Sequence, residues 1–268
     1  IPLRDEEITL PQVLRENGYV TAAIGKMHIT TQFMPKENEE DDWPEDRYGF
    51  DIIHTTCDCK TGEYLEWLKR ESPKDYEEVK MQGERKAKED RASAAEKDTS
   101  GPPQVYASGV DPLYHQSHWI ADRTIDLIRE SEPGKPFFAF CSFVDPHHPF
   151  DPPEPYASMY DPDALEAPDY EEGELLDKPP HFMKARTARG FSNEKYDYRR
   201  LSAHDWGRVK AAYYGMITLV DDNIGRVLDA LEEKGIEEDT LIMFTNDHGE
   251  LLGDHGLLFK GPFHYDSI

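Results

Sequence analysis

With 268 residues, the chain is long enough to bury one sizeable core, and one domain is the default expectation. Apolar residues make up 37% and charged residues 32%, a balance that excludes a disordered chain and predicts a heavily solvated surface. A formal net charge of −25 argues against a nucleic-acid partner, because a phosphate backbone requires a basic face. An acidic protein that binds an anion must build a local positive pocket, so clustered Lys and His residues are informative here.

Three cysteines are spaced unlike the ligands of a zinc site, because Cys57-x-Cys59 is tighter than the usual C-x₂-C pair and Cys141 stands far from both. We interpret them as buried thiols or a chance pair. The longest apolar runs, near residues 136–144 and 240–245, fall far short of the roughly 20 residues of a membrane span. The start, Ile1-Pro2-Leu3-Arg4, has neither an initiator Met nor a signal-peptide pattern, and we interpret it as a cut end.

The opening residues predict a helix followed by a strand. Thr9 is suited to cap the helix and Pro11 to its first turn, and Asn17-Gly18 ends it. Residues 19–24 are apolar and rich in β-formers, which predicts a short strand. Gly25-Lys26-Met27-His28 follows where that strand should end.

Two segments are dominated by charge. Between residues 60 and 100, Lys/Arg and Asp/Glu nearly cancel and apolar residues are sparse, which predicts an exposed helical insertion or a loop outside the core. Between residues 151 and 178, acidic residues and prolines prevail, which predicts a surface loop.

The remaining segments alternate between helix and strand. Apolar residues at helical spacing predict helices over residues 117–130 and 205–234. The apolar run over 136–144 suits a central strand covered on both faces, and residues 240–245 predict another strand. This alternation predicts an α/β fold: a three-layer sandwich whose central sheet is mostly parallel.

Polar clusters follow three of these strands, where ligands bind in parallel sheets. Lys26 and His28 lie two residues apart, so in an extended segment both project to one side and can seat a tetrahedral oxyanion. The alternative is a solvated turn. His147 lies between prolines that fix its direction, as suits a proton donor or an oxyanion ligand, or else a rigid turn. We expect His148 to be a bystander.

The third cluster combines a carboxylate with an imidazole. Asp247 and His248 can reach the same cation, although Asp-His pairs also occur in ordinary hydrogen-bonded turns. Lys260 lies thirteen residues after Asp247, close enough for a loop to return it to the same pocket, or else it is plain surface. The pair Asp221-Asp222 is interpreted as a solvated helix face or a capping pair and not as a metal site, because adjacent residues on a helix point in different directions.

Taken together and in order, these segments resemble the sulfatase family of the alkaline-phosphatase-like superfamily. The resemblance covers roughly a third of the chain and leaves residues 57–115 and 156–200 unmatched. The matching stretches are Thr9-Leu10-Pro11-x-x-Leu14-x-x-x-Gly18-Tyr19-x-Thr21-x-x-x-Gly25-Lys26-x-His28, Ser142-Phe143-x-x-Pro146-His147-x-Pro149-Phe150, Asp221-x-x-Ile224-Gly225, and Thr245-x-Asp247-His248-Gly249-x-x-x-Gly253-x-His255-Gly256-x-x-x-Lys260.

The resemblance implies an alkaline-phosphatase-like fold and a role for each matched residue. Lys26 and His28 would contact the sulfate and the oxygens of the nucleophile. Of the two, His28 would be a catalytic residue and Lys26 a substrate-binding residue. His147 would bind the sulfate or help to protonate the leaving oxygen, and Lys260 would bind the sulfate from the other side. Asp247 and His248 would bind a divalent cation, Ca²⁺ as is usual in sulfatases, with Mg²⁺, Mn²⁺ or Zn²⁺ as alternatives.

One departure concerns the nucleophile. Sulfatases use a formylglycine made from the Cys or Ser of a Cys/Ser-x-Pro-x-Arg motif, and no such motif occurs in this sequence. The resemblance therefore implies a fragment, residues 1–268 of a partial catalytic domain. In it, we expect residues 60–100 to form a charged insertion or loop and residues 151–200 to form a variable loop on the substrate side. The nucleophile would lie upstream, so the fragment alone should be inactive.

The expected parent is a sulfuric ester hydrolase acting on a sulfated small molecule or glycan, with a formylglycine-generating or maturase enzyme as partner. A phosphonate monoester or phosphodiester hydrolase of the same superfamily is the first alternative, because its motifs would be similar. A non-catalytic relative that binds an anion or a cation is the second.

Overall fold

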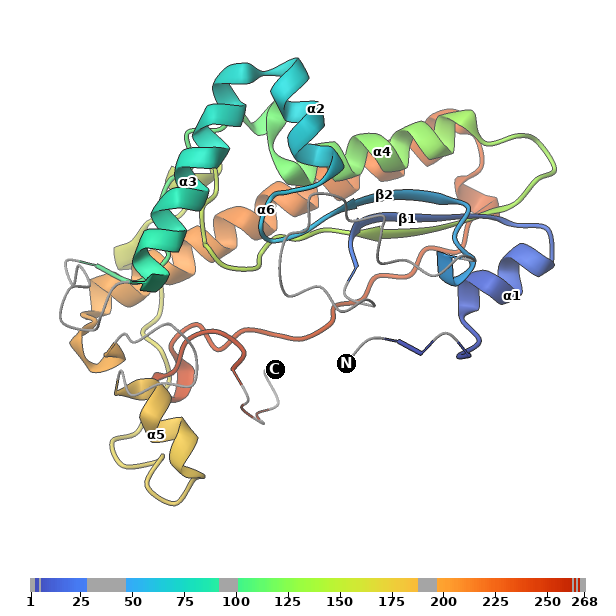
Figure 1. The fold of residues 1–268 in the computed structure, drawn as a ribbon. Helices are drawn as coiled ribbons and strands as arrows, with labels where there is room; N and C mark the ends of the chain where they lie inside the picture. Colours follow the sequence, from blue (N-terminus) through green and yellow to red (C-terminus); the bar gives the residue numbers. More distant parts are fainter. Residues whose placement is uncertain are drawn as a thin grey trace. The chain divides into compact units, whose positions relative to one another are not determined.

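The computed structural model describes residues 3–4, 6–27, 47–91, 101–187, 197–261, 263 and 265. Figure 1 shows the helices and strands of the chain, coloured along the sequence. The described residues belong to two compact units. The first, here called the sheet unit, comprises Ile1–Val79, Gly109–His147 and Leu219–Leu241. The second, here called the loop unit, comprises Lys80–Ser108, His148–Thr218 and Ile242–Ile268. His28 lies outside the described residues.

The sheet unit is organised around three parallel strands. β1 (Val20–Lys26) lies in the middle, with β2 (Ile52–Thr56) on one side and β3 (Phe137–Ser142) on the other. Gly25 is in register with Thr55 of β2 and with Ser142 of β3. The α/β class and the parallel sheet are thus confirmed, and the second helical layer of the expected sandwich stays a prediction.

The position of β3 corrects one expectation. The apolar run was expected to form a central strand covered on both faces, but in the described sheet β3 is an edge strand. None of its residues is fully buried, and Phe140 is 42% exposed. An apolar run predicts that a strand can be buried, but it does not predict the order of the strands in the sheet.

The first helix forms as the sequence predicts. α1 (Leu10–Glu16) begins after Thr9, whose hydroxyl accepts a hydrogen bond from the Gln12 backbone N–H. The Gln12 side chain in turn accepts from the Thr9 backbone N–H at 2.7 Å, which completes a capping box. Two N–H groups that a helix start leaves without partners are thereby satisfied.

The charged segment from residue 60 is helical, but it is not wholly outside the core. α2 (Glu63–Glu71) and α3 (Pro73–Arg91) form in it. Tyr64 and Leu68 of α2 are buried in the same core cluster as Trp119 and Ile120 of α4 (Gln116–Glu130). A spacing of four residues puts the two apolar side chains on one helix face, so the many charges occupy the other faces.

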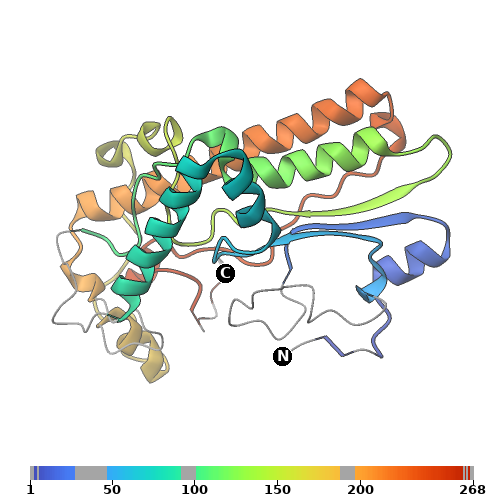
Figure 2. The same ribbon diagram turned by 45° about the horizontal axis from the view of Figure 1, so that its top comes forward.

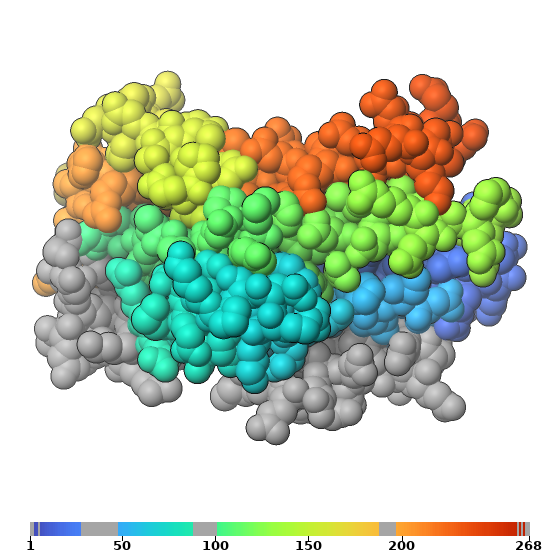
Figure 3. All heavy atoms as spheres, turned by 90° about the horizontal axis from the view of Figure 1, so that it is seen from above, coloured from blue at the N-terminus to red at the C-terminus, as the bar shows by residue number. Residues whose placement is uncertain are grey.

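The long helix predicted over residues 205–234 is confirmed as α6 (Ala203–Lys234). In the sheet unit, its second half packs along α4 through an apolar cluster of Ile125, Ile128, Ala230 and Leu231. The two helices run side by side over the same face of the sheet (Figure 2), and their side chains form adjacent bands on the surface (Figure 3).

The strand expected over residues 240–245 does not form in the described part of the chain. The segment is extended, but it belongs to no ladder, and Leu241, Met243 and Phe244 are 80–86% exposed. A strand requires a neighbouring strand to bond its backbone N–H and C=O groups, and β1, β2 and β3 pair only with one another.

The loop unit contains few regular elements. Residues 151–178 form turns and short 3₁₀ helices without an α-helix or a strand, as expected of a loop, although Asp151 and Leu175 are buried. α5 (Pro180–Arg186) follows. One core cluster gathers Phe150 with the first half of α6, and another gathers Phe182 with Leu251 and Leu257. Across the described residues, we find no helix long and apolar enough to cross a membrane.

Candidate functional site

The residues expected at the site form two groups, one in each unit of the chain. Lys26 and His147 belong to the sheet unit, and Asp247, His248 and Lys260 belong to the loop unit.

In the sheet unit, Lys26 and His147 follow neighbouring strands. Lys26 is the last residue of β1, and His147 lies in a turn that begins shortly after β3, where its backbone N–H donates to the Val144 carbonyl at 3.1 Å. Because parallel strands end at the same edge of a sheet, both residues belong to that edge. Both are half-buried, which is compatible with contact to a ligand.

Sequence reasoning missed a buried carboxylate beside His147. The side chain of Asp145 is 5% exposed, and it accepts a hydrogen bond from the Ser117 hydroxyl at the start of α4. Nδ1 of His115, the N-cap of α4, lies 3.5 Å from the same carboxylate. Burial raises the pKa of Asp145, and the Ser117 hydrogen bond opposes the rise. Asp145 therefore ties the turn that carries His147 to the start of α4.

In the loop unit, Lys260 returns to the pair formed by Asp247 and His248. Its Nζ lies 2.8 Å from Nε2 of His248. Nδ1 of His248 lies 2.7 Å from the Gly249 carbonyl oxygen, which can only accept a hydrogen bond. Nδ1 therefore carries the imidazole proton, and the lone pair of Nε2 accepts from the Lys260 ammonium group.

Oδ2 of the Asp247 carboxylate lies 3.4 Å from the same nitrogen of His248. A neutral imidazole nitrogen and a carboxylate oxygen are both ligands of divalent cations, and this spacing allows one ion to touch both. The two donors thus fit part of a metal site. No group of three His, Cys, Asp or Glu side chains gathers at one point within the described residues, so further ligands must come from other groups.

The turn of the chain between residues 251 and 261 explains how Lys260 returns. Leu252, His255 and Phe259 adopt positive φ angles, as do three glycines in the same stretch. The Gly253 N–H donates to the Leu257 carbonyl at 2.8 Å, which closes the loop. Phe259 is buried against Phe150, so the residue preceding Lys260 is fixed by packing.

Tyr213 and the ring pair of His148 and Phe259 lie in the same unit as this group. Burial raises the pKa of Tyr213 on α6 to about 12, with the negative charges of Glu250 and Asp247 adding to the effect. The ring of His148 lies 4.2 Å from the ring of Phe259, centre to centre. His148 therefore packs against the loop that holds Lys260, and its bystander role stays a prediction.

A further contact was missed by sequence reasoning. Nδ1 of His255 lies 2.8 Å from the Glu174 carboxylate, and its ring stacks on Tyr265 at 3.8 Å. The Asp169 N–H donates to the Asp254 carboxylate at 3.0 Å. The acidic loop is therefore tied to the loop that carries Lys260. The only signal in the sequence was the pattern Gly253-Asp254-His255-Gly256.

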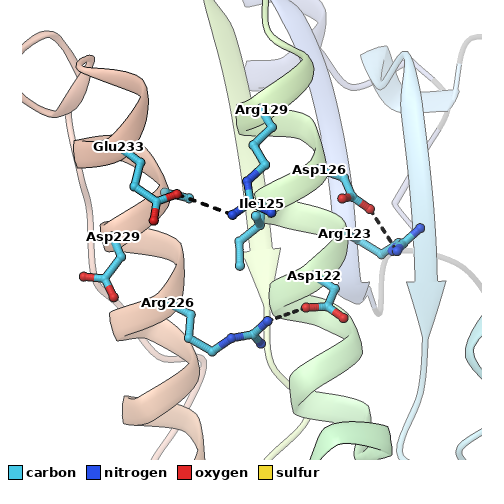
Figure 4. A pocket seen from close by; sticks show the side chains of 9 residues that line it. Asp122, Arg123, Ile125, Asp126, Arg129, Arg226, Asp229 and Glu233 are labelled. Atoms are coloured by element: carbon cyan, nitrogen blue, oxygen red, sulfur yellow. Dashed lines mark hydrogen bonds and ion pairs between the residues drawn. The ribbon is translucent and has the colours of Figure 1, made fainter.

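A groove of about 390 Å³ lies elsewhere, between α4 and the second half of α6 (Figure 4). It contains none of the expected site residues. Arg226 pairs with Asp122 at 2.5 Å and Arg129 with Glu233 at 3.4 Å. We interpret these contacts as ion pairs that join the two helices. Asp221 and Asp222, on the same helix, are exposed, as expected.

Comparison with known proteins places this arrangement among the alkaline-phosphatase-like hydrolases. A phosphonate monoester hydrolase of Agrobacterium radiobacter superimposes with a TM-score of 0.70 at 26% identity, over 99% of this chain and 52% of that one. The multifunctional alkaline phosphatase superfamily protein PehA of Trinickia caryophylli is 29% identical over 283 aligned positions, covering 100% of this chain and 52% of that protein. An arylsulfatase of Clostridium perfringens is 38% identical over 156 residues, covering 57% of this chain and 30% of that protein.

The family itself follows from the sequence profile described as Sulfatase, which matches residues 1–266. The chain belongs to the sulfatase family of the alkaline phosphatase superfamily. It spans about half or less of the length of the relatives named above.

Proposed function

We propose that this chain carries part of the active site of a metal-dependent sulfuric ester hydrolase. The observation that supports it most directly is the position of His248 next to two residues that the family motif assigns to the same site. Lys260 donates to His248 Nε2 while the Asp247 carboxylate lies 3.4 Å from the same nitrogen. Residues twelve and thirteen positions apart are thus gathered around one point.

In the proposed reaction, Asp247 and His248 hold the divalent cation, Ca²⁺ by analogy with the family. When bound, this cation polarises the sulfate ester as a Lewis acid. Lys260 and Lys26 place ammonium donors against the sulfate oxygens, where negative charge must be stabilised. His147 holds a proton for the leaving oxygen, and the buried Asp145 anchors its turn. We assign His28 to the nucleophile and the sulfate on the family motif alone.

The nucleophile is proposed to be a formylglycine outside this sequence, made from Cys or Ser by a formylglycine-generating or maturase enzyme. The substrate is proposed to be a sulfated small molecule or glycan. The many carboxylates between residues 151 and 178 would repel a densely sulfated polymer, so a substrate with few sulfates suits this site better.

A second function has an observation in its favour. Two phosphonate monoester hydrolases superimpose on 99% of this chain with TM-scores of 0.70, and their identities are 26% and 25%. A phosphonate monoester is also an anion with tetrahedral geometry, and ammonium donors beside a cation would bind it in the same way.

The test is an assay of the full-length protein with an aryl sulfate and an aryl phosphonate monoester, each with Ca²⁺ and with a chelator. A higher kcat/KM for the sulfate, lost on chelation, is the expected result. A higher kcat/KM for the phosphonate would replace the proposed function by the second one. Turnover that survives chelation would contradict the metal assignment, and absence of turnover with both esters would favour a non-catalytic relative.

A further inference from the structure

The lone pair of His248 Nε2 is used by Lys260. Nδ1 carries the imidazole proton, because it donates to the Gly249 carbonyl, and Nε2 therefore accepts from the Lys260 ammonium group at 2.8 Å. Oδ2 of the Asp247 carboxylate lies 3.4 Å from the same nitrogen. The Lys260 ammonium group thus already occupies the Nε2 lone pair that a cation shared with Asp247 would need.

One lone pair cannot serve an ammonium proton and a metal ion together. A divalent cation bound to Nε2 would also repel an ammonium group held a few ångströms away. From this geometry, we propose that Lys260 is a tethered competitor of the divalent cation, and that metal binding breaks the Lys260–His248 hydrogen bond. Lys260 is then released to bind the anionic group of the substrate. This inference rests on the metal role given to Asp247 and His248 in the proposed function.

Two features of the chain support an exchange. Lys260 has four rotatable side-chain bonds, so its ammonium group can leave Nε2 without a backbone change. The backbone before Lys260 is held, since Phe259 is buried in a core cluster. The ammonium group therefore stays near the site after displacement. The consequence is that metal binding and anion binding are coupled through one side chain.

The test measures Mn²⁺ binding to the full chain by electron paramagnetic resonance of the free ion. Carboxylates elsewhere on the acidic surface also bind Mn²⁺, so binding at the proposed site is defined as the Mn²⁺ binding that Asp247→Asn removes. We expect Lys260→Met to raise the Mn²⁺ affinity of this site about 10-fold, within the range of 5- to 150-fold that coupled sites usually show. Lys210→Met is the matched control. It removes a positive charge in the same unit, where Lys210 donates to the Glu166 carbonyl at 3.0 Å, and it should change affinity less than about twofold.

The outcomes separate the inference from the proposed function. If Asp247→Asn removes no Mn²⁺ binding with either residue at position 260, the metal site fails and the inference fails with it. If Asp247-dependent Mn²⁺ binding exists but Lys260→Met leaves its affinity unchanged or weaker, Lys260 does not compete with the cation, and the metal site itself still stands.

A second measurement uses the unmodified protein, so it does not depend on how a variant folds. Lysines are acetylated with a water-soluble active ester, with and without Mn²⁺, and quantified by mass spectrometry. A displaced Lys260 should react several times faster when Mn²⁺ is present, while Lys210 should not change. Equal rates at Lys260 in both conditions would overturn the inference.

Discussion

A Cβ atom on Gly25 would lie 1.9 Å from the carbonyl oxygen of Ser142. The two residues are register partners in β1 and β3, next to the edge where Lys26 ends its strand. Gly25 also has a φ angle of +94°, which side chains rarely tolerate. The close approach of these two strands beside Lys26 therefore requires a residue without a side chain.

Replacing Gly25 should accordingly destabilise the sheet unit. We expect Gly25→Ala to lower the free energy of unfolding by at least about 2 kcal/mol, because the backbone of β3 must move or φ must change. Gly83→Ala is the control: its Cβ would meet nothing within 4 Å on the exposed face of α3, so stability should rise by about 0.5–1 kcal/mol. Urea denaturation of both variants measures the difference, and equal stabilities would contradict the steric argument.

The buried carboxylate of Asp145 predicts a pH effect of defined sign. Burial raises its pKa, so the folded protein binds this proton more readily than the unfolded chain does. The stabilisation that comes from this tighter proton binding is therefore fully present below the usual carboxyl pKa of about 4. It is lost as the pH rises through the raised pKa of Asp145 in the folded protein. Asp145→Asn keeps an acceptor for Ser117 and removes the charge, so it should be more stable than wild type at pH 7 and equally stable at pH 3.

Asp197 provides a control of opposite sign. A hydrogen bond from Arg199 is the main cause that lowers the pKa of Asp197. The stabilisation that the ionised Asp197 provides is present above the usual carboxyl pKa. It is lost as the pH falls through the lowered pKa of Asp197 in the folded protein. Asp197→Asn should therefore be less stable than wild type at pH 7, and the deficit should disappear in acid. Denaturation series at several pH values test both variants, and a deficit of the same sign for both would refute the assignment.

The sequence predicted best those features that depend on local chemistry. The capping box of Thr9 and Gln12 and the spacing of apolar residues in α4 and α6 determine their helices without distant contacts. The spacing left two alternatives for Lys260, a return to the pocket of Asp247 or plain surface, and the family resemblance favoured the return that brings it to His248. The roles assigned to these side chains stay predictions.

The features that escaped prediction depend on residues distant in the chain. Phe137–Ser142 has the composition of a central strand, yet its neighbours decide that it lies at an edge. Residues 240–245 have the composition of a strand and lack a partner in the described chain. Burial of Tyr64 and Leu68 was missed, because charge averaged over 40 residues conceals an apolar helix face. Asp145 was missed because its partner, Ser117, is 28 residues away.

The ion pair of Arg226 and Asp122 joins α4 to α6 (Figure 4) and should contribute modestly. Both side chains are about one-third exposed, so solvent screens the attraction. A double-mutant cycle with Asp122→Asn and Arg226→Met should give a coupling of about 0.5–1 kcal/mol that shrinks in 1 M salt. A coupling near zero at low salt would leave the apolar cluster of Ile125 and Leu231 as the main link.

The proposed roles at the site predict losses of activity in the full-length protein. Lys260→Ala and His147→Ala should each lower kcat by about 10²-fold or more, as the loss of one oxyanion donor commonly does. Asp247→Ala should instead lower the metal content of the purified protein, measured by elemental analysis. Lys210→Ala, at a half-buried position in the loop unit that is outside the proposed site, is the control and should keep wild-type turnover.

The three site variants are also distinguished by what restores them. If Asp247 binds the cation, excess Ca²⁺ should recover part of the activity of Asp247→Ala, because weakened binding is offset by mass action. Excess Ca²⁺ should not restore His147→Ala, which lacks a proton donor whatever the metal occupancy. Lys260→Ala should need less Ca²⁺ than wild type for half-maximal activity, since the competing ammonium group is gone. Near-normal kcat in both Lys260→Ala and His147→Ala would remove these side chains from the active site.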